Sequence, residues 1–335
     1  MKRLIAFLLL ACLLLSACGR AEVEEDATVG YKPPEVVGGT TQTTDVEVKG
    51  EEPKDDGKTT VTEKTINGNK VPVGDYTGKF PVITEQNNFS VFSLNMNGVD
   101  DRKTENYGAR VQALMALLVQ LKPDVITLQE AGSTWMDFIV PQLDGIYDYY
   151  LIYPNDGDKA DANPIFFKTE KFQDTTGGCF WISDTPEQPS AAVNGKYYNC
   201  TWLELQEKGT ENKIHVFNSR LDAAVGVQGA VVIRGKCDAA GWRKAIVCSV
   251  DLGEAISGAA GQILQKNLID SNAAAKTDAT VKAGGVKDFS LYTKIYLTPV
   301  SYSVLNGYDL SDHNPLFTHY SINTETLNYE DQFIF

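Results

Sequence analysis

Two residues near the end of the chain, Asp312 and His313, are adjacent in the stretch GYDLSDHNPLF. The chain has only 3 histidines in 335 residues, so a histidine beside a carboxylate is a candidate for catalysis. A carboxylate can bind a divalent cation, and an imidazole can accept or donate a proton near neutral pH. The same residues could instead form a polar turn before a last strand, because the sequence Ser-Asp ahead of Asn-Pro favours a turn.

Polar residues also stand at the ends of other predicted strands. Strand ends that gather at one edge of a sandwich can build a single site on a rigid scaffold. Two carboxylates and an amide oxygen suit a hard cation such as Mg²⁺ or Ca²⁺, which polarises a phosphoryl oxygen, and an imidazole can then activate water. Taken alone, Asn95 is explained by an ordinary strand end and Asp251 by a turn, whereas the helix and the Pro-Asp before Gln129 and Glu130 favour a functional role for those two residues. The residues are Asn95, Gln129, Glu130, Arg220, Asp222 and Asp251.

The apolar pattern predicts the elements that would position these residues. Apolar residues recur at helical spacing from Tyr107 onward, and Pro123 stops that helix. Strands are predicted over 88–97, 124–130, 213–222 and 244–252, with two more near the end of the chain. Strands outnumber helices and often follow one another directly. This predicts an α+β fold, two packed sheets with helices outside.

In this order the motifs resemble the endonuclease/exonuclease/phosphatase superfamily, over about residues 89–322. The stretch RVQALMALLVQLKPDVITLQE is the most specific, with its Arg-led helix, Pro-Asp turn and Gln-Glu strand end. SLNMN is similar to the family's first Asn-bearing strand, and SDHNPLF is similar to its terminal Ser-Asp-His-x-Pro. The resemblance implies a four-layer α/β/β/α sandwich, the deoxyribonuclease-like fold.

The resemblance also implies an activity, metal-dependent hydrolysis of a phosphoester of phosphodiesterase, nuclease or phosphatase type. The cation would be Mg²⁺ or another divalent ion such as Mn²⁺ or Ca²⁺. By this resemblance Glu130, Asn95 and Asp312 hold the metal. Arg220 binds the phosphate, and His313 with Asp251 handles the water.

Three positions depart from the family pattern. Arg220 stands in NSRLD where a histidine is expected, and although arginine can bind phosphate it cannot act as an acid near pH 7. Gly253 replaces an asparagine, and Thr293 falls where an aspartate normally orients the terminal histidine. These departures motivate an alternative, a catalytically degenerate member that binds a ligand or partner at the surface. Arg220 could also be a surface cation paired with Asp222.

The first 18 residues, MKRLIAFLLLACLLLSAC, read as a targeting segment. Their apolar run is short for a membrane span, and LSAC resembles a bacterial lipobox with Cys18 as the lipidated residue. A plain secretory signal is the alternative. Residues 19–75 are predicted as a disordered acidic tether and residues 76–335 as the folded domain. We therefore expect a membrane lipoprotein, anchored through Cys18, with its domain outside the cytoplasm.

The net charge of −14 disfavours long nucleic acid, because phosphate binding normally needs a basic surface. A phosphorylated small molecule or a lipid headgroup fits better than nucleic acid as the partner of this domain. We expect a monomer.

Four cysteines remain after the targeting segment, Cys179, Cys200, Cys237 and Cys248. An even number in an exported chain suggests disulfides, and three pairings are possible. The local pairs 179–200 and 237–248 are favoured, and four buried free thiols are the alternative.

Overall fold

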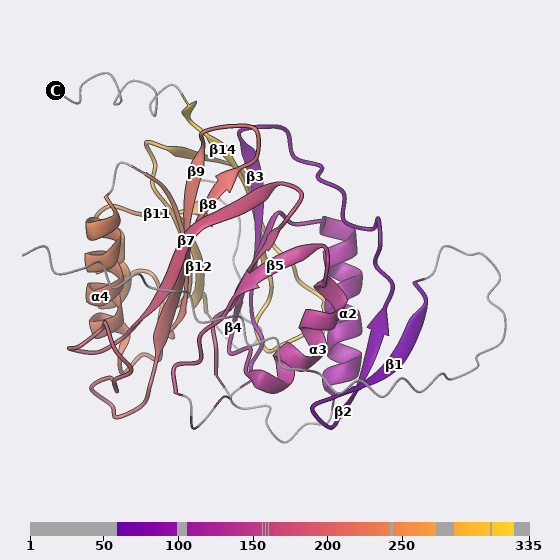
Figure 1. Cartoon of the computed structure of the whole chain (residues 1–335). Coiled ribbons are helices and arrows are strands. Elements are labelled where there is room, and N and C mark those ends of the chain that lie inside the picture. The colour runs from indigo at the N-terminus through magenta and orange to yellow at the C-terminus, as the bar shows by residue number, and fades with distance from the viewer. Residues whose placement is uncertain are drawn as a thin grey trace, which may run out of the picture. The chain divides into compact units, whose positions relative to one another are not determined.

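A computed structural model of the chain describes residues 59–98, 106–155, 157, 159, 161–241, 244–272, 285–308 and 310–324. Two six-stranded sheets form the centre of this part (Figure 1). In sheet I the order is β13 (Leu297–Val304), β14 (Leu316–Ile322), β3 (Asn88–Asn95), β4 (Val125–Gln129), β6 (Ile165–Lys168), β5 (Tyr147–Tyr150). In sheet II it is β11 (Ile269–Asp270), β12 (Asp288–Tyr292), β10 (Ala245–Asp251), β9 (Lys213–Arg220), β8 (Asn199–Glu207), β7 (Phe172–Trp181).

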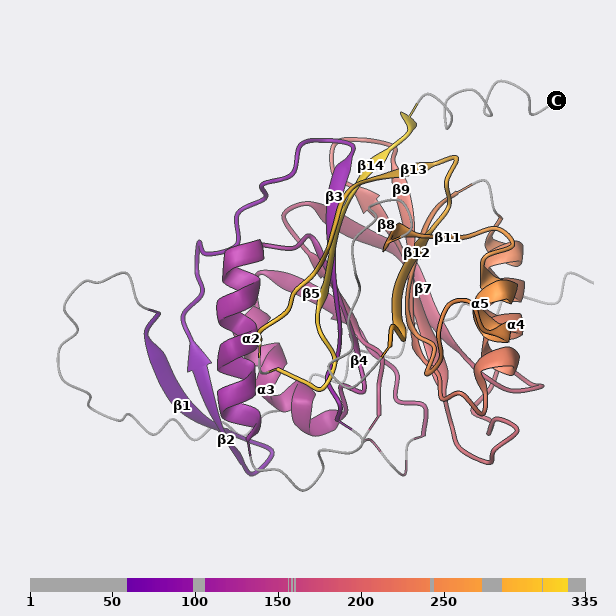
Figure 2. The ribbon, with the colours of Figure 1, turned by 180° about the vertical axis from the view of Figure 1, so that it is seen from behind.

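Helices cover the outer face of each sheet (Figure 2). α2 (Tyr107–Leu121) and α3 (Ser133–Leu143) pack on sheet I, and α4 (Gly226–Ala240) and α5 (Ala259–Leu264) pack on sheet II. A third apolar core, to which both sheets contribute, fills the space between them. The predicted α+β architecture, a four-layer α/β/β/α sandwich, is confirmed.

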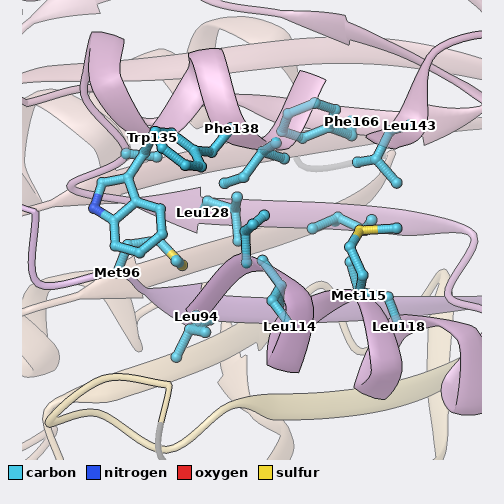
Figure 3. Packing of buried hydrophobic residues seen from close by; sticks show 14 of the residues in the cluster. Leu94, Met96, Leu114, Met115, Leu118, Leu128, Trp135, Phe138, Leu143 and Phe166 are labelled. Atoms are coloured by element: carbon cyan, nitrogen blue, oxygen red, sulfur yellow. The ribbon is translucent and has the colours of Figure 1, made fainter. Parts of the chain in front are cut away.

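The core under α2 follows from the helical spacing of its apolar residues. Leu114, Met115 and Leu118 are fully buried, and they face Leu94 of β3 and Leu128 of β4 (Figure 3). Burying one such side chain contributes about 1.5–3 kcal/mol. The helix ends just before Pro123, with the residue after Leu121 in the left-handed conformation, as the proline predicts.

Strand direction decides where the polar strand ends meet. β3 runs parallel to β4, and β9 runs parallel to β10, so the carboxyl ends of each pair lie at one edge. β14 is antiparallel to β3, and β12 is antiparallel to β10. The amino ends of β14 and β12 therefore lie at the same edges as the carboxyl ends of their neighbours. In sheet II this places Asp288 directly opposite Asp251.

A hairpin precedes the sandwich, formed by β1 (Val61–Ile66) and β2 (Asn69–Gly74). Asn67 and Gly68 make its turn with φ of 48° and 84°, which is the left-handed conformation that Asn-Gly hairpin turns adopt. Val71 and Val73 enter the core with α2 and α3. The prediction of a disordered tether is therefore wrong for residues 61–74, because the Asn-Gly turn signal was not recognised.

The predicted lipidation site, Cys18, and the targeting segment lie outside the described residues. Lipidation there and membrane anchoring stay predictions. In the part of the chain that the structure describes, no helix combines the length and the apolar character needed to cross a membrane.

The four cysteines of the domain are free, so the predicted disulfides are wrong. Cys179 lies opposite Thr201 in the ladder, and Cys200 lies opposite Phe180. Neighbouring positions along a strand point to opposite faces of a sheet, so Cys179 and Cys200 face different layers. Cys237 and Cys248 are fully buried in the core of α4 and α5, and burial raises the pKa of both thiols.

A buried ion pair fixes the start of β4. Asp124 accepts hydrogen bonds from the backbone N–H and the hydroxyl of Ser90 in β3, both near 3.0 Å. Lys168 Nζ lies 3.4 Å from Asp124 Oδ1, and both side chains are almost completely buried. Lys168 also donates to the carbonyls of Pro81 and Lys122. The pair therefore joins β6 to the turn that sets β3 and β4 in register.

We expect Lys168→Met to lower the free energy of unfolding by about 3–5 kcal/mol, because it leaves the Asp124 carboxylate buried and uncompensated. Urea unfolding measures this. Lys70→Met is the matched control, because Lys70 and Glu63 form a surface pair with side chains 77% and 46% exposed. That control should change the free energy by no more than about 0.5 kcal/mol. Equal losses in the two variants would contradict the role given to the buried pair.

Candidate active site across the two sheets

Side chains from both sheets meet at the edge where the strand ends converge. Each contact joins a residue of sheet I, or of the loop before β14, to a residue of sheet II. We call this set the cross-sheet site: Asn95, Glu130 and His313 on one side, and Arg220, Asp251 and Asp288 on the other. The contacts are Asn95 Nδ2 to Asp251 Oδ2 at 2.8 Å, Arg220 Nε to Glu130 Oε1 at 2.9 Å and His313 Nδ1 to Asp288 Oδ2 at 2.7 Å.

A second polar contact behind the site holds the sheets together. Gln129 at the end of β4 donates to Asn218 Oδ1 of β9 at 2.7 Å. Asn218 in turn donates to the carbonyls of Leu128 and Pro164, both at 2.8 Å. All these groups are buried, and a buried amide left without partners is costly. The separation of the two sheets is therefore fixed next to the site.

His313 is paired with a buried carboxylate. Burial opposes its charged form, but the hydrogen bond to Asp288 and the nearby carboxylates Asp251 and Asp312 outweigh burial and raise its pKa to about 9. The imidazole is therefore protonated at neutral pH, with Nδ1–H donated to Asp288. Its Nε2–H remains available to an oxygen of a bound molecule.

The expectation that this histidine lacks its supporting aspartate is wrong. Asp288, at the start of β12, supplies the carboxylate. Thr293 lies just past the other end of that strand, where its hydroxyl donates to the carbonyl of Lys244 and accepts from the N–H of Ile246. The sequence does carry a signal for this residue: Asp288 is the first residue of the strand DFSLY, just as Asp251 is the last residue of β10.

Asp251 is held in a fixed orientation. Its Oδ1 accepts from the N–H of Gly253 at 2.8 Å and its Oδ2 accepts from Asn95. Burial and the neighbouring charge of Asp288 raise its pKa to about 6. Asn95 Oδ1 accepts from the N–H of Asn97, which fixes the amide with its nitrogen toward the carboxylates.

Glu130 follows β4 in the left-handed conformation, with φ of 52°. Gly98 permits this path, because a Cβ at that position would lie 1.9 Å from the Glu130 carbonyl oxygen. The Glu130 carboxylate is 6% exposed, and its Oε1 receives N–H groups from Arg220 and from Asn95, the latter at 3.2 Å. Residues other than glycine that adopt the left-handed conformation are often found at functional sites.

Arg220 is surrounded by carboxylates. Besides Glu130, it contacts Asp222 Oδ1 at 2.8 Å, and it lies 3.9 Å from Asp161 Oδ2. The predicted pairing with Asp222 is therefore present, but the guanidinium is only 17% exposed and belongs to the site rather than to the open surface. The sequence did not single out Asp161, which lies in an ordinary polar stretch, KADAN.

At Gly253, where the resemblance leads us to expect an asparagine, the backbone leaves little room for a side chain. Its φ is +65°, and a Cβ would lie 2.7 Å from the backbone nitrogen of Ala223. Residue 253 therefore contributes only its N–H to the site.

Two of the predicted metal ligands, Asn95 and Glu130, are in contact at 3.2 Å, and the third, Asp312, lies at the margin of the site. The Asp312 side chain is 56% exposed, and its Oδ1 lies 3.8 Å from His313 Nε2 at the margin of the site. Within the described ranges, the acidic and histidine side chains close enough to share an ion are Asp251, Asp288 and His313, whose ligand atoms lie within 4.8 Å of one another.

The donor chemistry of the site fits a hard divalent cation. The site and its margin supply several carboxylate oxygens, and buried Asp288 Oδ1 has no hydrogen-bond partner among the described residues. The other oxygens of Asp251 and Asp288 already accept hydrogen bonds. Both Asp251 oxygens therefore serve its hydrogen bonds, and the carboxylates of Asp288, Glu130 and Asp312 are the ones that would face a cation.

Arg110 of α2 positions two loops of the site. It donates to the carbonyl of Met96, just after β3, and to the carbonyl of Leu310 at 2.7 Å, just before Asp312. Its guanidinium also lies over the Trp135 ring, 4.5 Å from the centroid. The arginine of the predicted helix motif therefore connects helix, strand end and histidine loop.

Solved structures share this architecture. An endonuclease/exonuclease/phosphatase family protein from Bacteroides thetaiotaomicron matches with a TM-score of 0.60 and 22% identity, covering 70% of this chain and 97% of that one. A mannosyl-6-phosphatase of the same species matches at 0.62 and 21% identity, covering 69% and 99%. The human Nocturnin catalytic domain with a bound sulfate matches at 0.58 and 14% identity, covering 72% and 97%.

This is the endonuclease/exonuclease/phosphatase fold. No family model matches the sequence, and no curated protein matches it. The cross-sheet site occupies the edge of this fold where the strand ends meet.

We expect Asp288→Asn to lower the pKa of His313 from about 9 toward its ordinary value of 6.5, because the imidazolium loses its partner carboxylate. Histidine ring signals in NMR spectra of the metal-free protein, followed against pH, measure this. His319 is the internal control, because its Nδ1 pairs with Ser301 and not with the site. A His313 pKa that stays near 9 in the variant would show that Asp288 does not set it.

Proposed function

We propose that the protein is a divalent-cation-dependent phosphoester hydrolase. The observation that carries the proposal is the His313–Asp288 pair facing Asp251 at one edge of the sandwich, with their ligand atoms within 4.8 Å. A proton donor and a proton acceptor are thus placed side by side. Similarity in fold to a mannosyl-6-phosphatase and to a domain with a bound sulfate supports a tetrahedral oxyanion as the group that binds here.

Two cations of the chain would receive the phosphate. His313 presents Nε2–H, and Arg220 presents a guanidinium that can bind two oxygens of a phosphate at once. Both lie among carboxylates in a protein of net charge −14. A local pair of cations in such surroundings favours a small phosphorylated molecule or a lipid headgroup over long nucleic acid, whose binding would need an extended basic surface.

The two groups with raised pKa values, Asp251 and His313, would carry out proton transfer. Asp251, with its pKa near 6, accepts a proton from water as the water oxygen bonds to phosphorus. His313 donates its Nε2 proton to the leaving oxygen as the phosphorus–oxygen bond breaks. The Asn95 amide keeps Asp251 in position, and Asp288 keeps the imidazole charged and oriented.

Glu130 and Asp312 would hold the cation, Mg²⁺, Mn²⁺ or Ca²⁺. When bound, it neutralises charge on the phosphoryl oxygens. Asn95, predicted as a ligand, instead holds Asp251 through its nitrogen.

A second function, ligand binding without hydrolysis, is favoured by two of the substitutions. Arg220 occupies Glu130 Oε1, and Gly253 supplies no side chain. Such a protein would bind a phosphorylated ligand and release it unchanged. Membrane anchoring through Cys18, and a monomeric state, accompany either function as proposals.

Hydrolysis of p-nitrophenyl phosphate, bis-(p-nitrophenyl) phosphate and plasmid DNA, with Mg²⁺, Mn²⁺ or Ca²⁺ and with EDTA, separates the two functions. We expect turnover of a small phosphoester that EDTA abolishes. Asp251→Asn should lower kcat by about 10²–10⁴-fold, because it removes the proton acceptor.

His319→Asn is the matched control, because it changes a histidine outside the site and should leave turnover unchanged. No turnover with any cation, together with retained phosphate binding, would favour the binding function. Turnover that Asp251→Asn leaves intact would refute the assigned role of Asp251.

A further inference from the structure

Glu130, the carboxylate that is expected to bind the metal, is already paired with a positively charged side chain of the protein, Arg220. Glu130 Oε1 receives Arg220 Nε at 2.9 Å and Asn95 Nδ2 at 3.2 Å. Two N–H groups therefore point at one of the two oxygens that Glu130 offers to a divalent cation, and the positive charge of Arg220 lies beside the carboxylate. Arginine keeps its charge at any accessible pH, so it cannot yield the oxygen by losing a proton.

Arg220 is held firmly in this place. Its second terminal nitrogen contacts Asp222 Oδ1 at 2.8 Å, and its guanidinium carbon lies 5.8 Å from the centroid of the Tyr198 ring. The Tyr198 hydroxyl donates to the other oxygen of Asp222, which orients that carboxylate. The guanidinium is thus a built part of the site, and its bond to Glu130 must break before a cation can reach Oε1.

We propose that Arg220 competes with the divalent cation for Glu130, and that a phosphate group which attracts Arg220 makes Glu130 available, so that cation and phosphate bind cooperatively. The reason is charge balance at close range. A cation alone would leave Arg220 beside a second positive charge, and a phosphate alone would draw Arg220 away from Glu130 and place an anion near that carboxylate. When both bind, each charge has a partner.

The inference deepens the proposed function, on which it rests for its biological role, but it concerns binding and can be measured without turnover. Linkage requires that phosphate tighten cation binding by the same factor by which the cation tightens phosphate binding. Typical coupling between two sites is about 5–150-fold. We expect a factor in that range for the wild-type protein.

Mn²⁺ binding, measured by the EPR signal of free Mn²⁺ with and without submillimolar inorganic phosphate, tests the inference. In the wild type, phosphate should tighten Mn²⁺ binding at least about 5-fold. Arg220→Gln should bind Mn²⁺ more tightly than the wild type without phosphate, and phosphate should then change the affinity little. Lys196→Gln is the matched control, because Lys196 lies 3.9 Å from Asp222 with a side chain 72% exposed. It should behave as the wild type does.

The reverse titration keeps the test decisive if Arg220→Gln does not fold. Phosphate binding to the wild type is measured with and without Mn²⁺, and absence of coupling overturns the inference. Equal Mn²⁺ affinity in the wild type and a folded Arg220→Gln variant also overturns it, as does coupling that persists in the variant. Hydrolysis without coupling would refute this inference alone, and coupling without hydrolysis would refute the proposed enzyme activity alone.

Discussion

The hydrogen bond from the Asn95 amide to Asp251 connects sheet I to sheet II at the edge that carries the site, and the geometry of the site depends on it. Asn95 and Asp251 are both buried, so this bond has little competition from water. The contacts of Glu130 with Arg220 and of His313 with Asp288 cross the same gap. In each of these three pairs the two partners lie on opposite sides of the gap. A change in the spacing of the sheets would therefore separate donors from acceptors.

The second feature of the site is its internal charge balance. Two permanent or nearly permanent cations, Arg220 and His313, lie among the carboxylates of Glu130, Asp251 and Asp288. The chain as a whole is strongly acidic, so these two cations are the local positive charge that would attract an anion to the site. The same balance keeps Glu130 occupied when no ligand is bound. The proposed phosphate would therefore need no basic surface on this acidic protein.

Much of this arrangement could be predicted from the sequence, because strand direction alone brings polar strand ends to a common edge. Asn95 and Asp251 were found in that way. The resemblance does not predict the supporting aspartate, because it points to Thr293 for the position that Asp288 fills. The contact of Arg220 with Glu130 could not be predicted, since it depends on how two sheets face each other. The pair 179–200 could not be excluded from the sequence for a similar reason, because sequence spacing does not show which face of a sheet a side chain takes.

The most direct test is a crystal structure of the protein with Mn²⁺ and inorganic phosphate, with the metal located by its anomalous scattering. We expect a metal peak bonded to Glu130, a phosphate on Arg220 and His313, and a lengthened distance between Arg220 and Glu130. A metal peak away from the cross-sheet site, or a phosphate bound there with Arg220 still on Glu130 and no metal, would contradict it.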